Sequence, residues 1–216
     1  GTGLLAHAGE KIGALVKGRQ AAIVTDSNVG PLYARTVKQS LEAQGFQVTV
    51  ITIEAGEASK SWQNAEMILT VLLEKKFHRD ACVVALGGGV TGDLAGFVAS
   101  VYQRGIAFFQ IPTSLLAQVD SSVGGKVAVN HALGKNMIGS FYQPKLVLID
   151  MDALQTLEER HWRNGLAEVV KYGVIYDAEF FAFHKEERRN RIAVLSAEEK
   201  RTMLRWVTGI RPGAYH

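Results

Sequence analysis

The sequence predicts an α/β fold: a mostly parallel sheet that forms a nucleotide-binding domain, followed by the start of an all-helical domain. The first observation is that short apolar segments alternate with amphipathic helical segments through residues 1–150, a pattern typical of a parallel sheet covered by helices. The second is that strand character disappears beyond Asp150. The third is a glycine-rich turn at Gly87–Gly92, between a predicted strand and a predicted helix.

Five apolar segments are long enough for buried strands and too short for helices. They comprise residues 21–25, 46–53, 81–86, 106–111 and 145–149. After the first of them, Pro31 suits the first position of a helix, and Gly45 ends that helix. Apolar residues at helical spacing predict two more helices, over residues 62–73 and 94–101.

The chain is expected to divide into two domains near residue 150. Residues 1–150 form the predicted α/β domain, and residues 151–216 form part of a predicted helical domain. The segment Thr156-Leu157-Glu158-Glu159 has the form of a capping box, in which a threonine and a glutamate three residues apart cap the first turn of a helix. We therefore expect a helix to start at this segment.

Composition and charge exclude several classes of protein. Apolar residues make up 47% of the chain and charged residues 21%, as in ordinary globular proteins. The net charge is only +3, and a basic cluster at residues 185–191 is typical of a solvated helix face, so no nucleic-acid partner is expected. No apolar run reaches the roughly 20 residues that span a bilayer, and no signal peptide is visible. We expect a cytoplasmic protein that binds a small anionic ligand.

The glycine-rich turn has the form G-x-G-x-x-G over Gly87–Gly92. Glycines let a backbone approach a diphosphate closely, and the following helix start offers free N–H groups. The turn departs from the usual dinucleotide pattern, because it follows a later strand and no acidic residue occurs about 20 positions further on. If a dinucleotide binds, its ribose hydroxyls need another acceptor, for which Asp26 and Glu57 are candidates. A tight turn without a ligand is the alternative.

Residues 112–143 combine charged side chains with glycine turns between two apolar strands. This pattern predicts a ligand cleft, although a surface loop with ordinary turn residues would have a similar composition. Lysine and aspartate side chains in this segment could hold a phosphate, a carboxylate and hydroxyl groups together. The polar residues concerned are Asp120, Ser121, Ser122, Lys126, Asn130, Lys135 and Asn136.

Glu168 and Lys171 lie three residues apart in a segment predicted to be helical, so their side chains share one helix face. An ordinary ion pair within the helix is one interpretation. The other makes Glu168 a metal ligand and Lys171 a substrate contact, but a zinc site needs three or four protein ligands. His161 lies on the same face, and a single histidine at this spacing is weak support for a metal.

Taken together, these motifs resemble the 3-dehydroquinate synthase family of sugar-phosphate cyclases. The likeness covers roughly residues 20–185, in order and at consistent spacing. The segments that carry it are Thr25–Asn28, Gly56–Glu57 with Lys60, Gly87–Asp93, Tyr102–Gly105, Pro112–Leu116, Val119–Lys126, Gly134–Gly139 and Gly165–Gly173.

The resemblance implies an NAD-dependent lyase of the shikimate pathway, which serves aromatic amino acid biosynthesis. Such an enzyme cyclises 3-deoxy-D-arabino-heptulosonate 7-phosphate to 3-dehydroquinate and releases phosphate, with zinc or cobalt as its divalent metal. The metal makes a ring hydroxyl more acidic, NAD oxidises it, and the hydride later returns, so the cofactor is regenerated. A homodimer is also implied.

The resemblance assigns NAD binding to residues 1–150, and metal and substrate binding to the partial helical domain of residues 151–216. It also implies roles for individual residues. Glu168 matches a ligand of the divalent metal, and Arg104 matches an arginine that reaches the substrate phosphate across a dimer interface. The other residues implied to form the substrate pocket are Asp120, Lys126, Lys135, Asn136 and Lys171. The residues implied to lie around NAD are Asp26, Asn28, Glu57, Lys60, Gly87, Gly88, Gly89, Val90, Asp93, Thr113, Ser114, Lys126, Lys135, Leu154, Gln155 and Thr156.

The chain departs from the family's pattern in two ways. Val127 stands where the family commonly has threonine, beside the expected pocket. The first strand that the family's pattern places before Gly1 is missing, and nothing after Lys171 resembles the later histidine-rich segment that supplies two metal ligands in the family. We therefore expect a fragment of a longer enzyme, truncated at both ends, or a shortened product with impaired activity. The alternatives are a related sugar-phosphate cyclase, a metal-dependent alcohol dehydrogenase of similar architecture, and an NAD-binding remnant without turnover.

Overall fold

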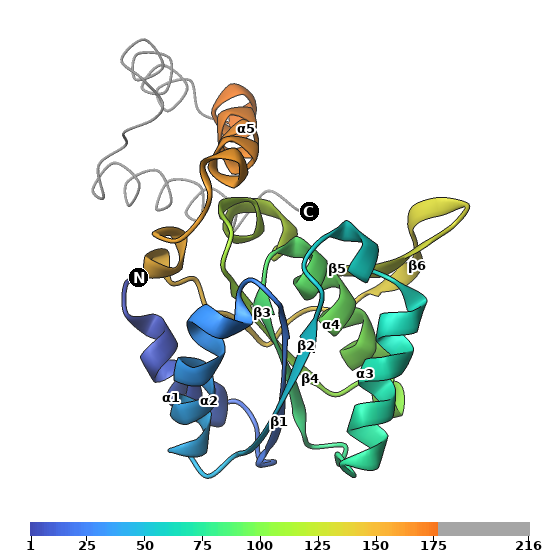
Figure 1. Ribbon diagram of the computed structural model, residues 1–216. Coiled ribbons are helices and arrows are strands. Elements are labelled where there is room, and N and C mark those ends of the chain that lie inside the picture. Colours follow the sequence, from blue (N-terminus) through green and yellow to red (C-terminus); the bar gives the residue numbers. More distant parts are fainter. Residues whose placement is uncertain (177–216) are drawn as a thin grey trace.

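The computed structural model describes residues 1–176, so the basic cluster at residues 185–191 and the last part of the expected helical domain lie outside the described residues. A five-stranded parallel sheet forms the centre of the molecule, with helices on both faces (Figure 1). Its strand order is β2-β1-β3-β4-β7. The strands are β1 (Gln20–Asp26), β2 (Gln47–Ile53), β3 (Cys82–Gly87), β4 (Ala107–Pro112) and β7 (Leu146–Val147). All five predicted strands, and the predicted parallel sheet, are confirmed.

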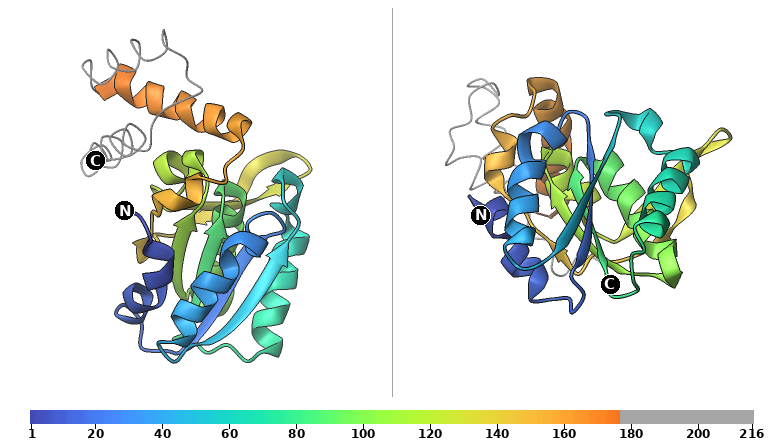
Figure 2. Two further views of the ribbon diagram at one scale, coloured as in Figure 1. Left: turned by 60° about the vertical axis from the view of Figure 1, so that its left-hand side comes forward. Right: turned by 60° about the horizontal axis from the view of Figure 1, so that its bottom comes forward.

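Alternate residues of the central strands serve two separate cores, because successive side chains of a strand point to opposite faces. Ala21 and Ile23 pack with α1 (Ala8–Gly13) and α2 (Arg35–Glu42) on one face of the sheet. Ala22 and Val24 pack with α3 (Trp62–Glu74) and α4 (Gly89–Val101) on the other face, as the turned views in Figure 2 show. Burial on both faces explains why these strands are apolar without alternation in the sequence.

The sheet has a switch point between β1 and β3. From β1 the chain moves outward to β2, then crosses back to place β3 on the opposite side of β1. The loops that follow β1 and β3 therefore leave the carboxyl edge of the sheet in opposite directions, and this is where open α/β sheets bind ligands. The glycine-rich turn follows β3. Although β3 is the third strand in the sequence, it is the middle strand of the sheet, so the turn lies at the centre of the carboxyl edge.

Helix boundaries differ from the predicted ones at three points. The predicted helix after Pro31 begins as a π-helical turn, η2 (Gly30–Ala34), before continuing as α2. Helix α4 begins at Gly89 rather than at Leu94, because its glycine-rich first turn lacks the apolar spacing that marked the rest. The helix that was expected to start at Thr156 is α5 (Glu159–Tyr176). It follows the 3-10 turn η6 (Met151–Leu154) and begins only at the last residue of the predicted capping box.

The predicted capping box at Thr156 is wrong. Its hydroxyl does not cap α5 but lies 2.6 Å from the hydroxyl of Tyr33, which follows β1 in the chain. Tyr33 also donates to the backbone carbonyl of Ala153, at 3.2 Å. A tertiary contact with a distant residue has replaced the local hydrogen bonds that the motif predicts.

A β-hairpin occupies part of the stretch that was expected to be a polar cleft. Strands β5 (Lys126–His131) and β6 (Gly134–Phe141) pair antiparallel and form a separate two-stranded sheet, which lies against α4 and projects at one side of Figure 1. The inner residues Val127 and Val129 join the core beneath α4, whereas β6 is exposed along nearly its whole length. Within the described part of the chain, no helix is both long and apolar enough to cross a bilayer.

Candidate functional site

The carboxyl edge of the sheet brings together three predicted segments. Pairing in register places Thr25 beside Leu86, and Gly87 beside Pro112, so β1, β3 and β4 end at the same level. The turn after β1, the glycine turn after β3 and the Thr113–Ser114 segment after β4 are consequently neighbours. The backbone N–H of Thr113 donates to the Gly87 carbonyl at 3.0 Å, which ties the second and third segments together.

The glycine turn packs so closely that side chains would not fit. A Cβ atom at Gly87 would lie 2.6 Å from the hydroxyl oxygen of Thr91, and one at Gly89 would lie 2.9 Å from that of Ser121. Gly88 is the N-cap residue of α4, and no side chain caps the first N–H groups of this helix. The first N–H groups of α4 therefore begin at a bare, glycine-lined surface, where the helix end favours an anion. Val90, in the first turn, is half buried.

Asp26 fixes the turn after β1 and links it to α4. One of its carboxylate oxygens accepts hydrogen bonds from the backbone N–H groups of Asn28 and Val29, both at 2.9 Å. The other accepts from the hydroxyl of Thr91, at 3.3 Å. Asp26 thus organises the turn after β1 and its contact with α4, and its role beside a ribose stays a prediction.

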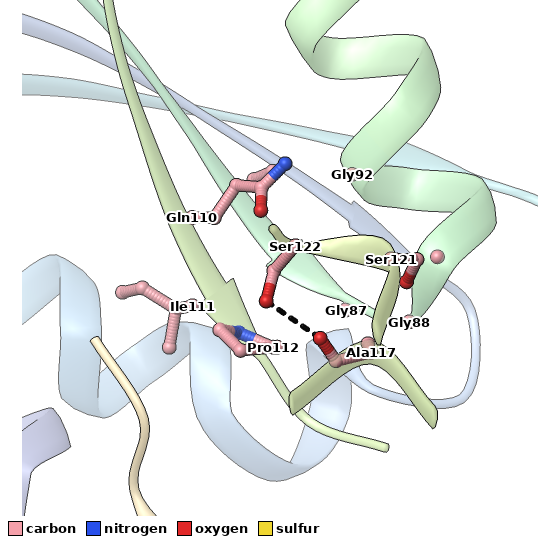
Figure 3. Close-up of a pocket in the computed structure, with 11 residues that line it drawn as sticks. Gly87, Gly88, Gly92, Gln110, Ile111, Pro112, Ala117, Ser121 and Ser122 are labelled. Atoms are coloured by element: carbon pink, nitrogen blue, oxygen red, sulfur yellow. Dashed lines mark hydrogen bonds between the residues drawn. The ribbon is translucent and has the colours of Figure 1, made fainter. Parts of the chain in front are cut away.

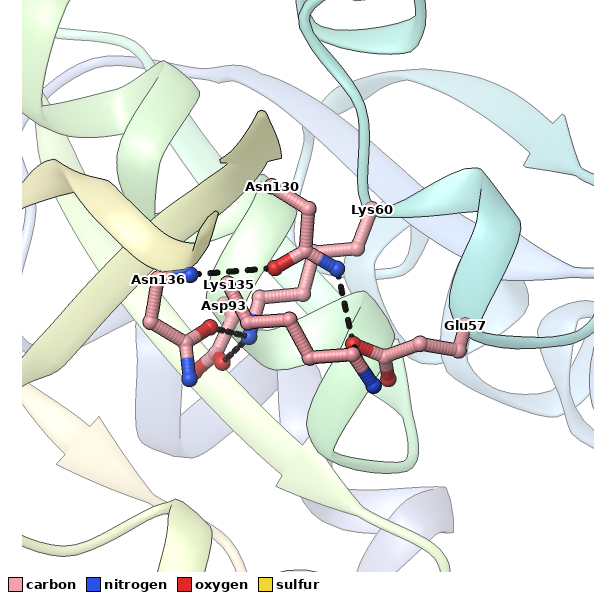
Figure 4. Close-up of polar contacts among 6 residues, drawn as sticks. All are labelled: Glu57, Lys60, Asp93, Asn130, Lys135 and Asn136. Atoms are coloured by element: carbon pink, nitrogen blue, oxygen red, sulfur yellow. Dashed lines mark hydrogen bonds and ion pairs between the residues drawn. The ribbon is translucent and has the colours of Figure 1, made fainter. Parts of the chain in front are cut away.

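A buried lysine forms the centre of a polar network beside α4 (Figure 4). Lys60 is only 5% exposed, and its ammonium group donates to the carboxylate of Asp93 and to the side-chain oxygen of Asn136. The three residues come from the segment after β2, from α4 and from β6. A buried ammonium group is costly unless it is paired and hydrogen-bonded, and here both conditions are met.

The outer part of this network is held by Asn130. Its side chain donates to a carboxylate oxygen of Glu57 at 2.7 Å and accepts from the backbone N–H of Asn136 at 3.1 Å. The ammonium group of Lys135 lies 3.8 Å from the same Glu57 oxygen, on an exposed side chain. The hairpin is thereby joined to the turn after β2, and Asn136 is held with a positive φ of 60°.

Burial raises the pKa of Asp93 above its ordinary value, and the nearby Glu57 charge acts in the same direction. The hydrogen bond and charge of Lys60 lower this pKa, and the charge of Lys126 lowers it too. Lys126 is the first residue of β5, and its side chain is exposed. Strand β5 packs against α4, the helix that begins at the glycine turn.

The π-helical turn η5 (Ala117–Ser121), which contains Asp120, packs against α4, and its Ser121 lies next to Gly89 of the glycine turn. Ser121 and Ser122 line a small hollow together with Gly87, Gly88 and Gly89 (Figure 3). Ser114 lies at the beginning of the same segment, and its hydroxyl accepts from the backbone N–H of Ala117 at 3.3 Å.

The remaining predicted residues are not part of this cluster. Arg104 is exposed beyond the last turn of α4, at the end of the helix opposite to the glycine turn. Leu154 is buried among apolar residues, whereas Gln155 and Thr156 are exposed. The prediction that Arg104 serves the site of a second subunit stays a prediction.

Glu168 and Lys171 lie on α5, which packs on η5 above the carboxyl edge of the sheet. The ammonium group of Lys171 donates to the carboxylate of Glu168 at 3.1 Å, as in an ordinary helical ion pair. His161, on the same helix, is exposed and contacts Arg160. Among the residues that the structure describes, no three His, Cys, Asp or Glu side chains are grouped to hold a metal ion.

Sequence reasoning did not assign roles to Asn130, Thr91 or Ser121. Asn130 was noticed only as part of a polar stretch, yet it joins the hairpin to Glu57. Thr91 lies inside the glycine motif with its side chain close to Gly87, and Ser121 lies on η5 with its side chain close to Gly89. A signal for Thr91 was present in its position inside the glycine motif, but nothing local distinguishes Asn130 from a turn residue.

Comparison with known families agrees with this geometry. The profile of the 3-dehydroquinate synthase N-terminal family matches residues 50–164. The chain is 58% identical over 166 residues to 3-dehydroquinate synthase from Desulforamulus reducens, covering 77% of this chain and 46% of that protein. It is 55% identical over 183 residues to the enzyme of the same name from Acidithiobacillus ferrooxidans, covering 85% and 50%. The chain spans about half the length of the curated relatives it matches.

The fold is similar to a solved structure of ValA, a 2-epi-5-epi-valiolone synthase from Streptomyces hygroscopicus subsp. jinggangensis 5008. The TM-score is 0.85 at 30% sequence identity, and the match covers 97% of this chain and 58% of that one. That structure contains NAD+ and Zn2+.

Proposed function

The chain belongs to the 3-dehydroquinate synthase family, and from this membership we propose that it forms the NAD-binding part of an enzyme that converts 3-deoxy-D-arabino-heptulosonate 7-phosphate to 3-dehydroquinate. Phosphate is released in this reaction. The observation that carries the proposal is the meeting of the bare glycine turn with the Lys60–Asp93–Asn136 network at one edge of the sheet.

The residues at this edge fit a dinucleotide. The diphosphate would lie on the N–H groups of the first turn of α4, where Gly87 and Gly89 keep the backbone uncovered. Asp26, at the end of β1, and Glu57, in the turn after β2, would supply acidic groups for the ribose hydroxyls. Bound here, NAD supplies a group that takes a hydride and later returns it.

The hairpin and η5 supply the groups for the substrate. We assign Asp120, Lys126, Lys135 and Asn136 to its pocket, with the two lysines neutralising the phosphate and carboxylate and holding them in position. Both lysine side chains are exposed next to the network and remain within reach of an anion. Residues 1–150 would then form the cofactor domain, and α5 the first helix of a second domain.

The proposed metal site involves one described residue, Glu168. Glu168 would be one ligand of a zinc or cobalt ion, with Lys171 beside the substrate, and ValA gives a precedent for Zn2+ in a related cyclase. One carboxylate does not hold a catalytic zinc ion. The described residues do not complete a metal site.

The test is phosphate release from the heptulosonate phosphate, measured with NAD and with added zinc or cobalt. Lys126→Ala should abolish phosphate release while the dissociation constant for NAD changes little. Equal loss of both would show that Lys126 belongs to the cofactor site instead. NAD binding without phosphate release from any sugar phosphate would identify a binding unit without turnover, and release from a different sugar phosphate would identify a related cyclase.

Arg104 provides a test of the proposed homodimer. If it completes the pocket of a second subunit, Arg104→Ala and Lys126→Ala proteins should each be inactive alone and should recover activity when mixed, because one intact site forms at the interface. Absence of recovery in a mixture shown to exchange subunits would contradict this role.

A further inference from the structure

A buried glutamine lies in the middle of the sheet, beneath the glycine turn. Gln110 belongs to β4 and is only 4% exposed, although polar side chains are expected to be hydrogen-bonded when buried. Its side-chain oxygen has no hydrogen-bond partner among the described residues. The hydroxyl of Ser121 is equally buried and equally without a partner in this part of the chain.

Both groups line the same small hollow, together with Gly87, Gly88 and Gly89 of the turn. In Figure 3 the carboxamide of Gln110 reaches from β4 toward α4, with Ser122 next to it and Ser121 farther along the turn, near Gly88. The hollow has a volume of about 10 Å3, close to what one buried water molecule requires. Ser122 uses its own hydroxyl elsewhere, donating to the carbonyl of Ala117 at 2.6 Å.

The lining selects the chemistry of the occupant. No carboxylate lines the hollow, which disfavours a metal cation, and its volume of about 10 Å3 leaves no room for a phosphate group. The volume is too small for a ring or a carboxamide of a cofactor. A water molecule can donate to the Gln110 oxygen and either donate to or accept from the Ser121 hydroxyl, which satisfies both groups.

We propose that Gln110 and Ser121 hold one structural water beneath the glycine turn, and that this water keeps the turn in the shape that receives the cofactor diphosphate. A buried water makes about three hydrogen bonds, and the backbone of Gly87, Gly88 or Gly89, which line the same hollow, would supply the third. Gln110 is then a positioning residue that acts on the turn through the water. Only the effect on the cofactor rests on the proposed function; the water site itself does not.

The first test is a crystal structure of the whole chain at a resolution that shows ordered solvent. A single density peak within hydrogen-bond distance of Gln110 Oε1 and Ser121 Oγ is expected. The proposal is overturned if both atoms face other partners, or if the hollow is closed.

The second test is a double-mutant cycle with Gln110→Met and Ser121→Ala, measured by urea unfolding and by calorimetric titration with NAD. Each single change should weaken NAD binding by about three- to tenfold, the equivalent of one lost hydrogen bond. The double variant should be no weaker than the single ones, because both side chains hold the same water.

The matched control pairs Gln110→Met with Ser100→Ala. Ser100 lies at the far end of α4, where its hydroxyl donates to the Phe97 carbonyl at 2.7 Å, so the two effects should add. Additive effects for Gln110 and Ser121 would overturn the proposal. If the unchanged chain does not bind NAD, the proposed function is wrong, and so is the proposed effect of the water on cofactor binding. The density peak and the unfolding cycle would still decide whether the water is present.

Discussion

The Lys60 network and the Glu168–Lys171 pair contain similar residues but are built differently. Lys60 contacts residues that are 33 and 76 positions away in the sequence, and it is buried. Lys171 contacts a residue three positions away on its own helix, and its side chain is half exposed. The first arrangement exists only because the fold brings three segments together, whereas the second would form on any helix with this spacing. Polar groups assembled by tertiary structure are therefore the stronger indication of a site.

The largest expected effect tests this difference at Lys60. Lys60→Met should lower the free energy of unfolding by about 3–5 kcal/mol, because it leaves the Asp93 carboxylate poorly compensated in a buried place. Urea unfolding measures this. Lys135→Met is the matched control from the same network: its ammonium group is exposed, so a change below about 0.5 kcal/mol is expected.

A double variant tests whether the unpaired Asp93 carboxylate causes the loss of stability. Lys60→Met with Asp93→Leu removes both charges and should recover part of the lost stability. A Lys60 variant as stable as the unchanged protein would show that the buried pair contributes nothing.

The next largest loss of stability is expected at two glycines, one in the glycine turn and one on α5. Gly89→Ala and Gly165→Ala each place a Cβ against a neighbour, at 2.9 Å from Ser121 Oγ and at 2.6 Å from Leu115 side-chain atoms. Both should cost about 1–3 kcal/mol of stability, as overpacked positions do. Only Gly89→Ala should also weaken NAD binding in calorimetry. Weakening by both to the same extent would mean that α5 belongs to the cofactor site.

A smaller effect depends on pH. The pKa of Asp93 is raised in the folded protein, so the folded state binds more protons than the unfolded state between the ordinary value of 3.8 and the raised value. The contribution of Asp93 to stability should fall as the pH rises through this window. Subtracting the urea stability of Asp93→Asn, which cannot titrate there, isolates the slope. A difference that grows with pH would give the opposite sign and show that Lys60 outweighs burial.

The smallest effect is expected at Glu168. Glu168→Gln should change the free energy of unfolding by less than about 0.5 kcal/mol, because the lost ion pair is local and partly exposed. Zinc affinity, followed by calorimetry, should nevertheless fall if Glu168 is a ligand. Glu159→Gln is the control, since it removes the exposed pair with Arg163 on the same helix. Equal zinc binding by all three proteins would reduce Glu168 to a surface residue.

The sheet and the glycine turn could be predicted because their signals are local. Apolar segments of strand length and the strand–turn–helix context of Gly87–Gly92 lie within a few residues of one another. The hairpin could not be predicted: β6 is exposed along nearly its whole length, so its residues show no alternation between a buried and an exposed face. The motif at Thr156 failed for the opposite reason, because a distant tyrosine took the hydroxyl that a local cap would use.

The sequence by itself determined the α/β architecture, the position of the glycine turn and the residue types available around it. The tertiary structure alone decided which of those residues meet: Lys60 with Asp93 and Asn136, Asn130 with Glu57, and Gln110 with Ser121 around one hollow. The physical reason is that periodicity and turn chemistry act over a few neighbouring residues. Contacts between side chains more than 30 positions apart depend instead on strand order and register, which a sequence pattern does not specify.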